Sequence, residues 1–185
     1  MNRNFLLIVL VLTFFGACKS PEARKPVQHN SGSFISKSVE RNKAIYENEE
    51  KQIAQIIKKD STQNYIASEE GFWYYYNKKD SLQGISPKFG DHIIFKYDIK
   101  NLNGTEILSE NETGIQNYIV DKTNQELISG IRDGVKLMKE GETITFLFPS
   151  YNAFGYYGIE NKLGSNVPIQ CTITLIKINQ TNENN

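Results

Sequence analysis

Hydrophobic and polar residues change their pattern along the chain. Residues 38–60 carry apolar side chains at helical spacing, with Tyr46, Ile53, Ile56 and Ile57 close to one face, and this predicts a helix. The apolar face is narrow, which leaves two interpretations open: a spacer that packs lightly, or a surface that pairs with another chain. We expect from it that the following domain folds without the helix.

From Gly71 onward the pattern is typical of short strands. The strand-like segments are 72–76, 92–100, 118–120, 143–148 and 171–178. Residues 126–138 instead repeat apolar side chains at helical spacing and predict one helix. One helix against about five antiparallel strands indicates an α+β domain over residues 70–179, with the sheet wrapped around the helix.

The beginning of the chain resembles a bacterial lipoprotein signal. Arg3 precedes an apolar run over residues 5–15, which is about 16 Å long as a helix and too short to cross a bilayer. Two small residues then precede Cys18. The resemblance implies a signal peptide over residues 1–17 that is removed, with diacylglycerol attached to Cys18. An ordinary secretory signal followed by an unrelated cysteine is the alternative.

The residues that follow Cys18 bear on location. Residues 18–37 are polar and contain two prolines, which predicts a flexible tether, and residues 180–185 form a polar tail. Among lipoproteins, an aspartate after the cysteine often retains the protein at the inner membrane, and Lys19 stands there instead. By this analogy we expect a lipid anchor in the outer membrane of the cell envelope, with the protein facing the periplasm.

Composition excludes several classes of function. The 185 residues include 21 Lys+Arg and 21 Asp+Glu, and this balance argues against a nucleic-acid-binding protein. Two cysteines and two histidines are too few for a disulfide-dense scaffold, a four-cysteine zinc site or a multi-histidine metal site. There is no glycine-rich phosphate loop. The sequence therefore predicts neither a metal nor a cofactor.

An ordered set of motifs runs through the β-rich part. Residues 128–142 read I-x-G-x-x-x-G-V-x-x-M-x-x-G-E, and residues 149–155 read P-x-x-x-A-F-G. Phe-Gly-Asp at 89–91 precedes them, and Val-Pro at 167–168 follows. This order resembles the FK506-binding-protein (FKBP) type of peptidyl-prolyl cis-trans isomerase. With a lipoprotein signal, one helix and the segment 151–158, it also resembles the gliding-motility-associated lipoprotein isomerases of gliding bacteria.

The resemblance implies a fold, an activity and a site. The fold is an FKBP-like antiparallel sheet wrapped around one helix and preceded by an N-terminal helix. The activity is rotation about X-Pro bonds in proline-containing polypeptide clients, without a cofactor. The catalytic positions implied are Tyr97, Ile128 and Phe154, and the backbone N–H of Ile128 holds a substrate carbonyl. The implied substrate-binding residues are Ile107, Tyr118, Val120, Leu127, Ile131, Val167 and Leu175.

Three of the family's pocket residues are replaced here. Leu108 stands for an aspartate, Ile131 for the tryptophan of the pocket floor, and Phe154 for a tyrosine whose hydroxyl binds a ligand carbonyl. Three functions stay open. The first is an isomerase that assists the folding of exported envelope proteins, including gliding-motility components. The second is a catalytically weak chaperone or structural binding module of a motility or secretion complex. The third is an unrelated β-rich lipoprotein that carries an apolar ligand.

Overall fold

The computed structural model describes residues 31–80, 84–122 and 126–181. The signal peptide, Cys18 and the first part of the tether expected from the sequence lie outside these residues. The chain divides into two compact units, of which the second begins at Ser38 and contains the whole sheet. None of the described helices combines the length and the apolar character needed to cross a bilayer.

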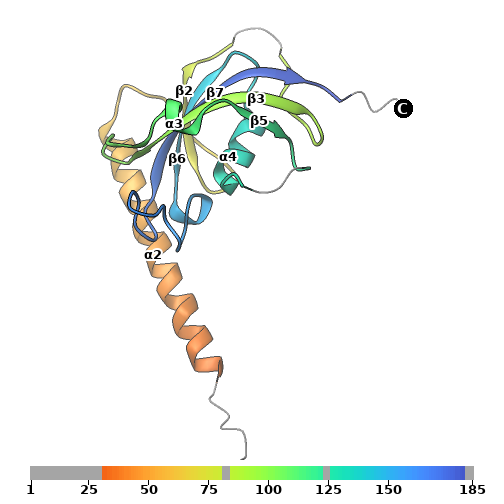
Figure 1. Cartoon of the computed structure of the whole chain (residues 1–185). Helices are drawn as coiled ribbons and strands as arrows, with labels where there is room; N and C mark the ends of the chain where they lie inside the picture. Colours follow the sequence, from red (N-terminus) through yellow and green to blue (C-terminus); the bar gives the residue numbers. More distant parts are fainter. Residues whose placement is uncertain (1–30, 81–83, 123–125, 182–185) are drawn as a thin grey trace, which may run out of the picture. The chain divides into compact units, whose positions relative to one another are not determined.

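A long helix precedes the sheet. Helix α2 spans Ser31–Lys59 (Figure 1), so it begins at Ser31 rather than at the Ser38 expected from the sequence. The other helical elements are one short turn each or little more. They are α3 (Glu110–Thr113), α4 (Ser129–Gly134) and the 3₁₀ segments η1 (Val135–Leu137) and η2 (Ser150–Asn152).

The sheet is antiparallel and has seven strands, two more than the pattern predicts. They are β1 (Ile66–Ala67), β2 (Trp73–Lys78), β3 (His92–Asn101), β4 (Glu106–Leu108), β5 (Gln116–Ile119), β6 (Thr143–Phe148) and β7 (Ile169–Asn179). Their order is β1-β2-β6-β7-β3-β4, and β5 also pairs with β3. β5 lies along the first half of β3 and β4 along the end of it. β1 and β4 are too short to produce a periodic signal in the sequence.

Helix α4 packs very closely against the inner face of the sheet (Figure 1). Two glycines permit this approach, because a Cβ atom on Gly130 would lie 2.6 Å from the ring of Phe148 and one on Gly134 would lie 3.0 Å from the ring of Phe146. The predicted helix over 126–138 is therefore real but shorter, and it continues as the 3₁₀ segment η1. Any larger side chain at Gly130 would push the helix away from the sheet.

The core lies between α4 and this inner face. Alternate residues of β3 and β6 point into it, among them Phe95, Phe146 and Phe148, which have no exposed surface. The rings of Phe146 and Phe148 are stacked with centroids 5.4 Å apart, and Phe72 meets both of them edge to face. Aromatic pairs of this kind add to the free energy of burial. In β3, the apolar residues of the sequence pattern therefore point into this core, and the polar residues between them point to the outer face of the sheet.

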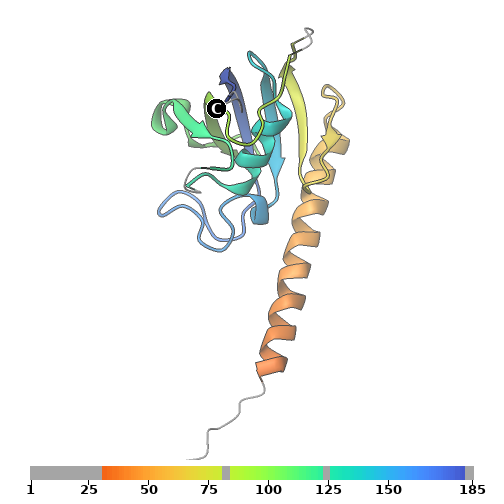
Figure 2. The same ribbon diagram turned by 90° about the vertical axis from the view of Figure 1, so that its right-hand side faces the viewer.

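Within the second unit, residues 38–59 of helix α2 lie on the outer side of the sheet, away from α4 (Figure 2). Ile53 of α2 and Leu147 on the outer face of β6 are 0% and 1% exposed, although neither belongs to the inner cluster. Glu49 is 2% exposed, and its two carboxyl oxygens accept hydrogen bonds from the backbone N–H and the hydroxyl of Ser150, both at 2.7 Å. On the narrow face predicted from the sequence, Ile53 is buried and Tyr46, Ile56 and Ile57 are half-buried. Together with the buried Glu49, this makes the expectation of a lightly packed spacer wrong for this half of the helix.

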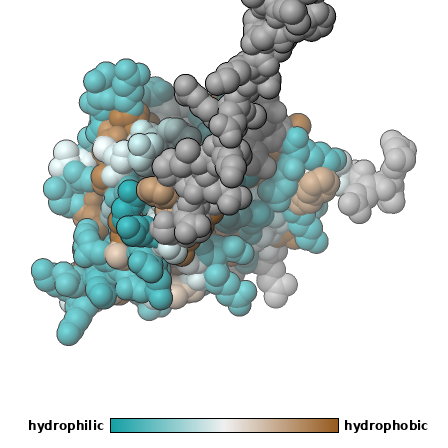
Figure 3. Space-filling model, turned by 90° about the horizontal axis from the view of Figure 1, so that it is seen from below, coloured by the Kyte–Doolittle hydropathy of each residue, from teal (hydrophilic) through white to brown (hydrophobic). Residues whose placement is uncertain are grey.

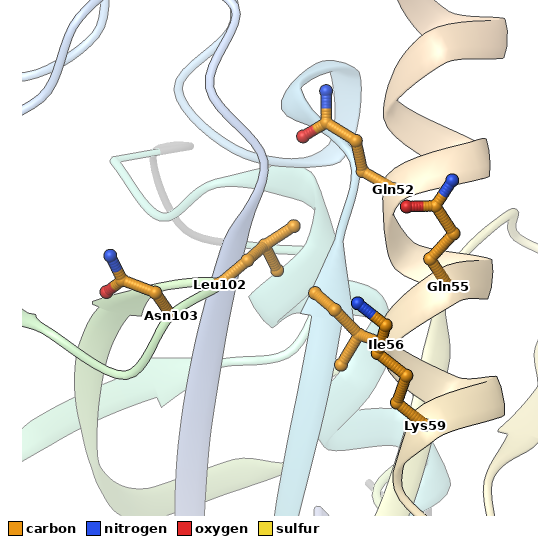
Figure 4. Close-up of a pocket in the computed structure, with 6 residues that line it drawn as sticks. All are labelled: Gln52, Gln55, Ile56, Lys59, Leu102 and Asn103. Carbon is orange, nitrogen blue, oxygen red and sulfur yellow. The ribbon is translucent and has the colours of Figure 1, made fainter.

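The end of α2 also faces the turn between β3 and β4. A shallow depression of about 370 Å³ lies there, and Ile56 of the helix and Leu102 of the turn are both directed into it (Figure 4). Gln52, Gln55, Lys59 and Asn103 complete its lining. Since polar side chains surround the two apolar ones, this region is the polar, solvent-facing edge of the contact between the helix and the sheet.

Candidate active site

Six of the ten residues implied by the resemblance lie at the surface of the inner core. They are half-buried, and they come from β3, from β4, from the approach to α4 and from the two ends of the long loop before β7. These residues are Tyr97, Ile107, Leu127, Ile128, Phe154 and Val167. The first five pack against the inner cluster. We call these six residues the groove set, after the substrate pocket that the family resemblance implies for them.

The other four residues lie deeper. Tyr118, Val120, Ile131 and Leu175 belong to the buried cluster, and none is more than 4% exposed. The Tyr118 hydroxyl accepts a hydrogen bond from the backbone N–H of Asp121 at 3.2 Å, so its polar end is occupied within the protein. In this structure these four residues support the groove set from below rather than present a surface to a ligand. A strand pattern cannot separate the two roles, because the lining and the support share one face of the sheet.

Tyr97 is held by its strand and by the short helix α3. Its carbonyl oxygen accepts a hydrogen bond of 2.6 Å from the hydroxyl of Thr113, which joins the end of α3 to the middle of β3. Burial raises the pKa of the Tyr97 phenol, and the nearby Cys171 adds to this shift. The phenol therefore stays neutral at physiological pH, as a side chain that meets an uncharged peptide should.

Ile128 stands at the N-cap of α4 with φ −58° and ψ 150°, and no side chain caps this helix. The first N–H groups of a helix have no intrahelical partner, so they are available to an acceptor. Two residues later, a Cβ atom on Gly130 would lie 2.7 Å from the backbone oxygen of Asn152. The start of α4 thus touches the segment η2, and this contact brings Ile128 to the same side of the domain as Phe154.

A compact turn presents Phe154. The carbonyl oxygen of Ser150 accepts hydrogen bonds from the N–H groups of Ala153 and Gly155, at 3.0 and 2.9 Å. Gly155 has a φ of +53°, in the left-handed region that favours glycine. Its own carbonyl oxygen accepts a hydrogen bond of 2.7 Å from Asn166, next to Val167. This hydrogen bond joins the two ends of the loop between η2 and β7. It therefore holds Val167 near the turn that carries Phe154.

The tip of the same loop reaches a second loop. Lys162 forms an ion pair with Glu112 of α3, and Glu112 also completes a capping box with Ser109. The hydrogen bond from Lys162 and those from Ser109 lower the pKa of Glu112 to about 2. The ion pair joins the loop that carries Phe154 to the helix that holds Tyr97. The sequence analysis missed this connection, because neither residue belongs to a motif.

The site has no acid–base machinery. Its side chains are aliphatic or aromatic, and Leu108 and Phe154 carry no polar group. Tyr156 and Tyr157 beyond Phe154 are 74% and 92% exposed. Seen from below, the described surface is largely hydrophilic, with hydrophobic residues in separate patches (Figure 3). The groove set can therefore bind an apolar segment and remove water from it.

Comparisons with known proteins agree with this geometry. The model of the FKBP-type peptidyl-prolyl cis-trans isomerase family matches residues 83–176, about half of the chain. A protein of Neisseria meningitidis serogroup B (strain ATCC BAA-335 / MC58), described as "Probable FKBP-type peptidyl-prolyl cis-trans isomerase FkpA", is 26% identical over 144 residues. These are 77% of this chain and 51% of that protein, so the chain spans about half the length of this curated relative.

Two solved structures are similar in fold. FkpA from Escherichia coli superposes with a TM-score of 0.57 and 18% identity, over 97% of this chain and 83% of the other. A peptidyl-prolyl cis-trans isomerase from Pseudomonas syringae pv. tomato str. DC3000 gives a TM-score of 0.57 and 19% identity, over 75% of this chain and 96% of the other. The predicted fold, an antiparallel sheet around one helix with a further helix before it, is confirmed.

The family match also excludes one of the three functions left open by the sequence. It covers the stretch from before β3 to near the end of β7, and both motifs that carry the resemblance lie inside it. An unrelated β-rich lipoprotein is thereby excluded. The chain belongs to the FKBP-type peptidyl-prolyl cis-trans isomerase family.

Proposed function

We propose that this protein is a peptidyl-prolyl cis-trans isomerase that assists the folding of exported proteins in the bacterial cell envelope. One observation carries the proposal: a chain of this family presents a half-buried apolar set around Tyr97, Ile128 and Phe154. Rotation about an X-Pro bond takes tens to hundreds of seconds without a catalyst, because a barrier of about 18–20 kcal/mol must be crossed. That reaction needs no cofactor.

The groove set acts by binding the twisted amide better than the planar one. Apolar walls remove water from the amide, and this weakens the resonance that keeps it planar. The N–H of Ile128, at the open end of α4, holds a carbonyl of the client and fixes the chain on one side of the proline. Each tenfold gain in rate requires about 1.36 kcal/mol of binding that is made only in the transition state.

A protease-free isomerisation assay tests the proposal. The full chain, purified in detergent, is mixed with a proline peptide, and kcat/KM is measured by line-shape or exchange spectroscopy. We expect Phe154→Ala to lower kcat/KM about tenfold or more, equivalent to ~1.4 kcal/mol of lost transition-state binding. Phe89→Ala is the matched control, because its ring is largely exposed and lies over Lys122. Absence of turnover in the wild type would reject the proposal.

A weakly catalytic chaperone or structural binding module is the second candidate. The observation that favours it is the apolar nature of Leu108 and Phe154, since the resemblance places polar groups at both positions. On this reading the groove set binds unfolded chains but stabilises the twisted amide poorly. Suppression of aggregation at stoichiometric concentration, combined with a kcat/KM near the uncatalysed limit, would select this function over the first.

We propose further that Cys18 carries lipid and anchors the protein in the outer membrane, and that its clients include gliding-motility components. Support comes from the short apolar run before Cys18, from Lys19 after it and from the resemblance to lipoprotein isomerases of gliding bacteria. Cys18→Ser should abolish labelling by radioactive palmitate and release the protein into the soluble envelope fraction. Unchanged labelling and membrane retention would refute the anchor.

A further inference from the structure

We infer that Glu49 of helix α2 is a positioning residue of the isomerase site: its carboxyl group holds Ser150 and thereby fixes the turn that presents Phe154. The inference rests on the proposed isomerase function. The two oxygens of Glu49 accept hydrogen bonds from the backbone N–H and from the hydroxyl of Ser150, each at 2.7 Å. Both residues are buried, at 2% and 0% exposure, so water does not compete for these bonds.

The first step from Glu49 to the groove set passes through a single residue, Ser150. The donors of Ser150 are held by Glu49, while the carbonyl oxygen of the same residue accepts the N–H groups of Ala153 and Gly155. Phe154 lies between these two donors. A shift or tilt of Ser150 therefore changes the turn directly, and the hydrogen bond from Asn166 to Gly155 transmits the change to the position before Val167.

The second step reaches Ile128 at the N-cap of α4. Asn152, at the end of η2, donates a hydrogen bond of 2.9 Å from its side chain to the carbonyl oxygen of Glu70. Its own backbone oxygen lies so close to Gly130 that a methyl group would not fit between them. The start of α4 thus rests on η2, so that Glu49 sets the distance between Phe154 and Ile128.

Simple attachment of the helix does not require this arrangement. Ile53 and the ring of Tyr46, which meets Tyr151 edge to face at 4.9 Å, already bind α2 to the domain through apolar contacts. Burial of a carboxyl group is costly unless strong hydrogen bonds compensate it. Here both bonds go to a single residue four positions before Phe154, where they fix orientation as well as distance. Such a pair is suited to positioning.

The decisive comparison is between Glu49→Gln and Ile53→Ala in the full chain, purified in detergent. The amide of Gln keeps one acceptor and turns a donor toward Ser150, whereas Ile53→Ala loosens the helix and leaves this pair intact. At a temperature where both variants are folded, we expect Glu49→Gln to lower kcat/KM about fivefold or more. We expect Ile53→Ala to lower the melting temperature at least as much while kcat/KM stays within about twofold of the wild type.

The backbone amide resonances of Ala153, Gly155 and Asn166 supply a readout that does not depend on turnover. They should shift in Glu49→Gln and stay in place in Ile53→Ala. Glu47→Gln is the matched control for the change of charge, because Glu47 lies on the same helix, is largely exposed and pairs only loosely with Lys43 at 3.9 Å. It should leave kcat/KM and these resonances unchanged.

Ser150→Ala is the second variant, should Glu49→Gln fail to fold. It removes the hydroxyl but keeps the N–H bond to Glu49, so we expect a smaller loss of kcat/KM and smaller shifts of the same three amides. Unchanged kcat/KM and unchanged amides in a folded Glu49→Gln or Ser150→Ala would overturn the inference and make Glu49 a mere anchor. If the wild type has no turnover, the proposed function fails, and the amide resonances alone decide whether Glu49 positions the turn.

Discussion

The two faces of the sheet are covered by helices in contrasting ways. The inner face meets α4 through aromatic and branched aliphatic side chains, and two glycines bring the helix almost against the rings. The outer face of β6 and β7 carries threonine pairs, such as Thr145 and Thr172 with hydroxyls 3.1 Å apart, and α2 adds one buried carboxyl group. The inner face is therefore the main apolar core of the domain, while hydrogen bonds on the outer side fix the geometry of the loop that serves the groove set.

Phe146→Ala should give the largest effect. The Phe146 ring has no exposed surface and touches the rings of Phe72, Tyr74 and Phe148. We expect the free energy of unfolding to fall by about 3–5 kcal/mol, because the cavity is closed in by strands and by α4. Urea denaturation measures this, and Phe89→Ala on the surface should change the value by less than ~0.5 kcal/mol. Equal effects of the two variants would contradict the assignment of the inner core.

Ile53→Ala tests whether the contact between α2 and the outer face of the sheet also stabilises the fold. Complete burial of Ile53 predicts a loss of about 2–5 kcal/mol in the free energy of unfolding, with the lower half of that range expected at the edge of the helix–sheet contact. Val39→Ala, at an exposed position of the same helix, is the control and should change little. If the two variants unfold at the same urea concentration, the original expectation of a dispensable helix is restored.

The sequence predicts the inner face much better than the outer one. Alternation in β3 and β6 and the glycine spacing of α4 follow from burial and close approach, which leave a periodic record. Glu49 leaves no such record, since it lies in a run of acidic residues, Glu47, Glu49 and Glu50, and only the tertiary structure distinguishes it from its exposed neighbours. The short strands β1 and β4 were missed for another reason: two or three residues are too few to show a periodic pattern, although each pairs with a strand that is close to it in the sequence.

The site shows the same division. The residues that the resemblance implies lie at the surface of the inner core or within it, but the resemblance does not separate the half-buried Tyr97 and Phe154 from the buried Val120 and Leu175. Depth depends on how far the sheet curves around α4, and a single strand does not encode that curvature. The connection from Lys162 to Glu112 was likewise invisible, because two surface loops meet only after the sheet has formed.

Phe154→Tyr should strengthen binding on the inner side without a comparable change in stability. The added hydroxyl restores the donor that the resemblance assigns to this position, and a hydrogen bond to a neutral carbonyl contributes about 0.5–1.5 kcal/mol net. This corresponds to roughly two- to twelvefold tighter binding of an FK506-type macrolide, measurable by calorimetric titration. Circular dichroism controls for folding. An unchanged dissociation constant would indicate that the hydroxyl does not reach the ligand from this loop.

Removal of the ion pair between Glu112 and Lys162 should give the smallest change in stability. The pH dependence of this change is the sharpest test of the ion pair. The folded-state pKa of Glu112 is lowered to about 2, so its contribution to stability is fully present above the ordinary pKa of a glutamate and is lost as the pH falls through about 2. The difference in melting temperature between the wild type and Glu112→Gln should therefore be constant from neutral pH to about pH 5.5 and shrink below that. Because the pair is exposed, added salt should also reduce the difference. Lys162→Met should show the same loss. If the difference instead grows in acid, Glu112 is not stabilised in its charged form, and the ion pair does not hold the two loops together.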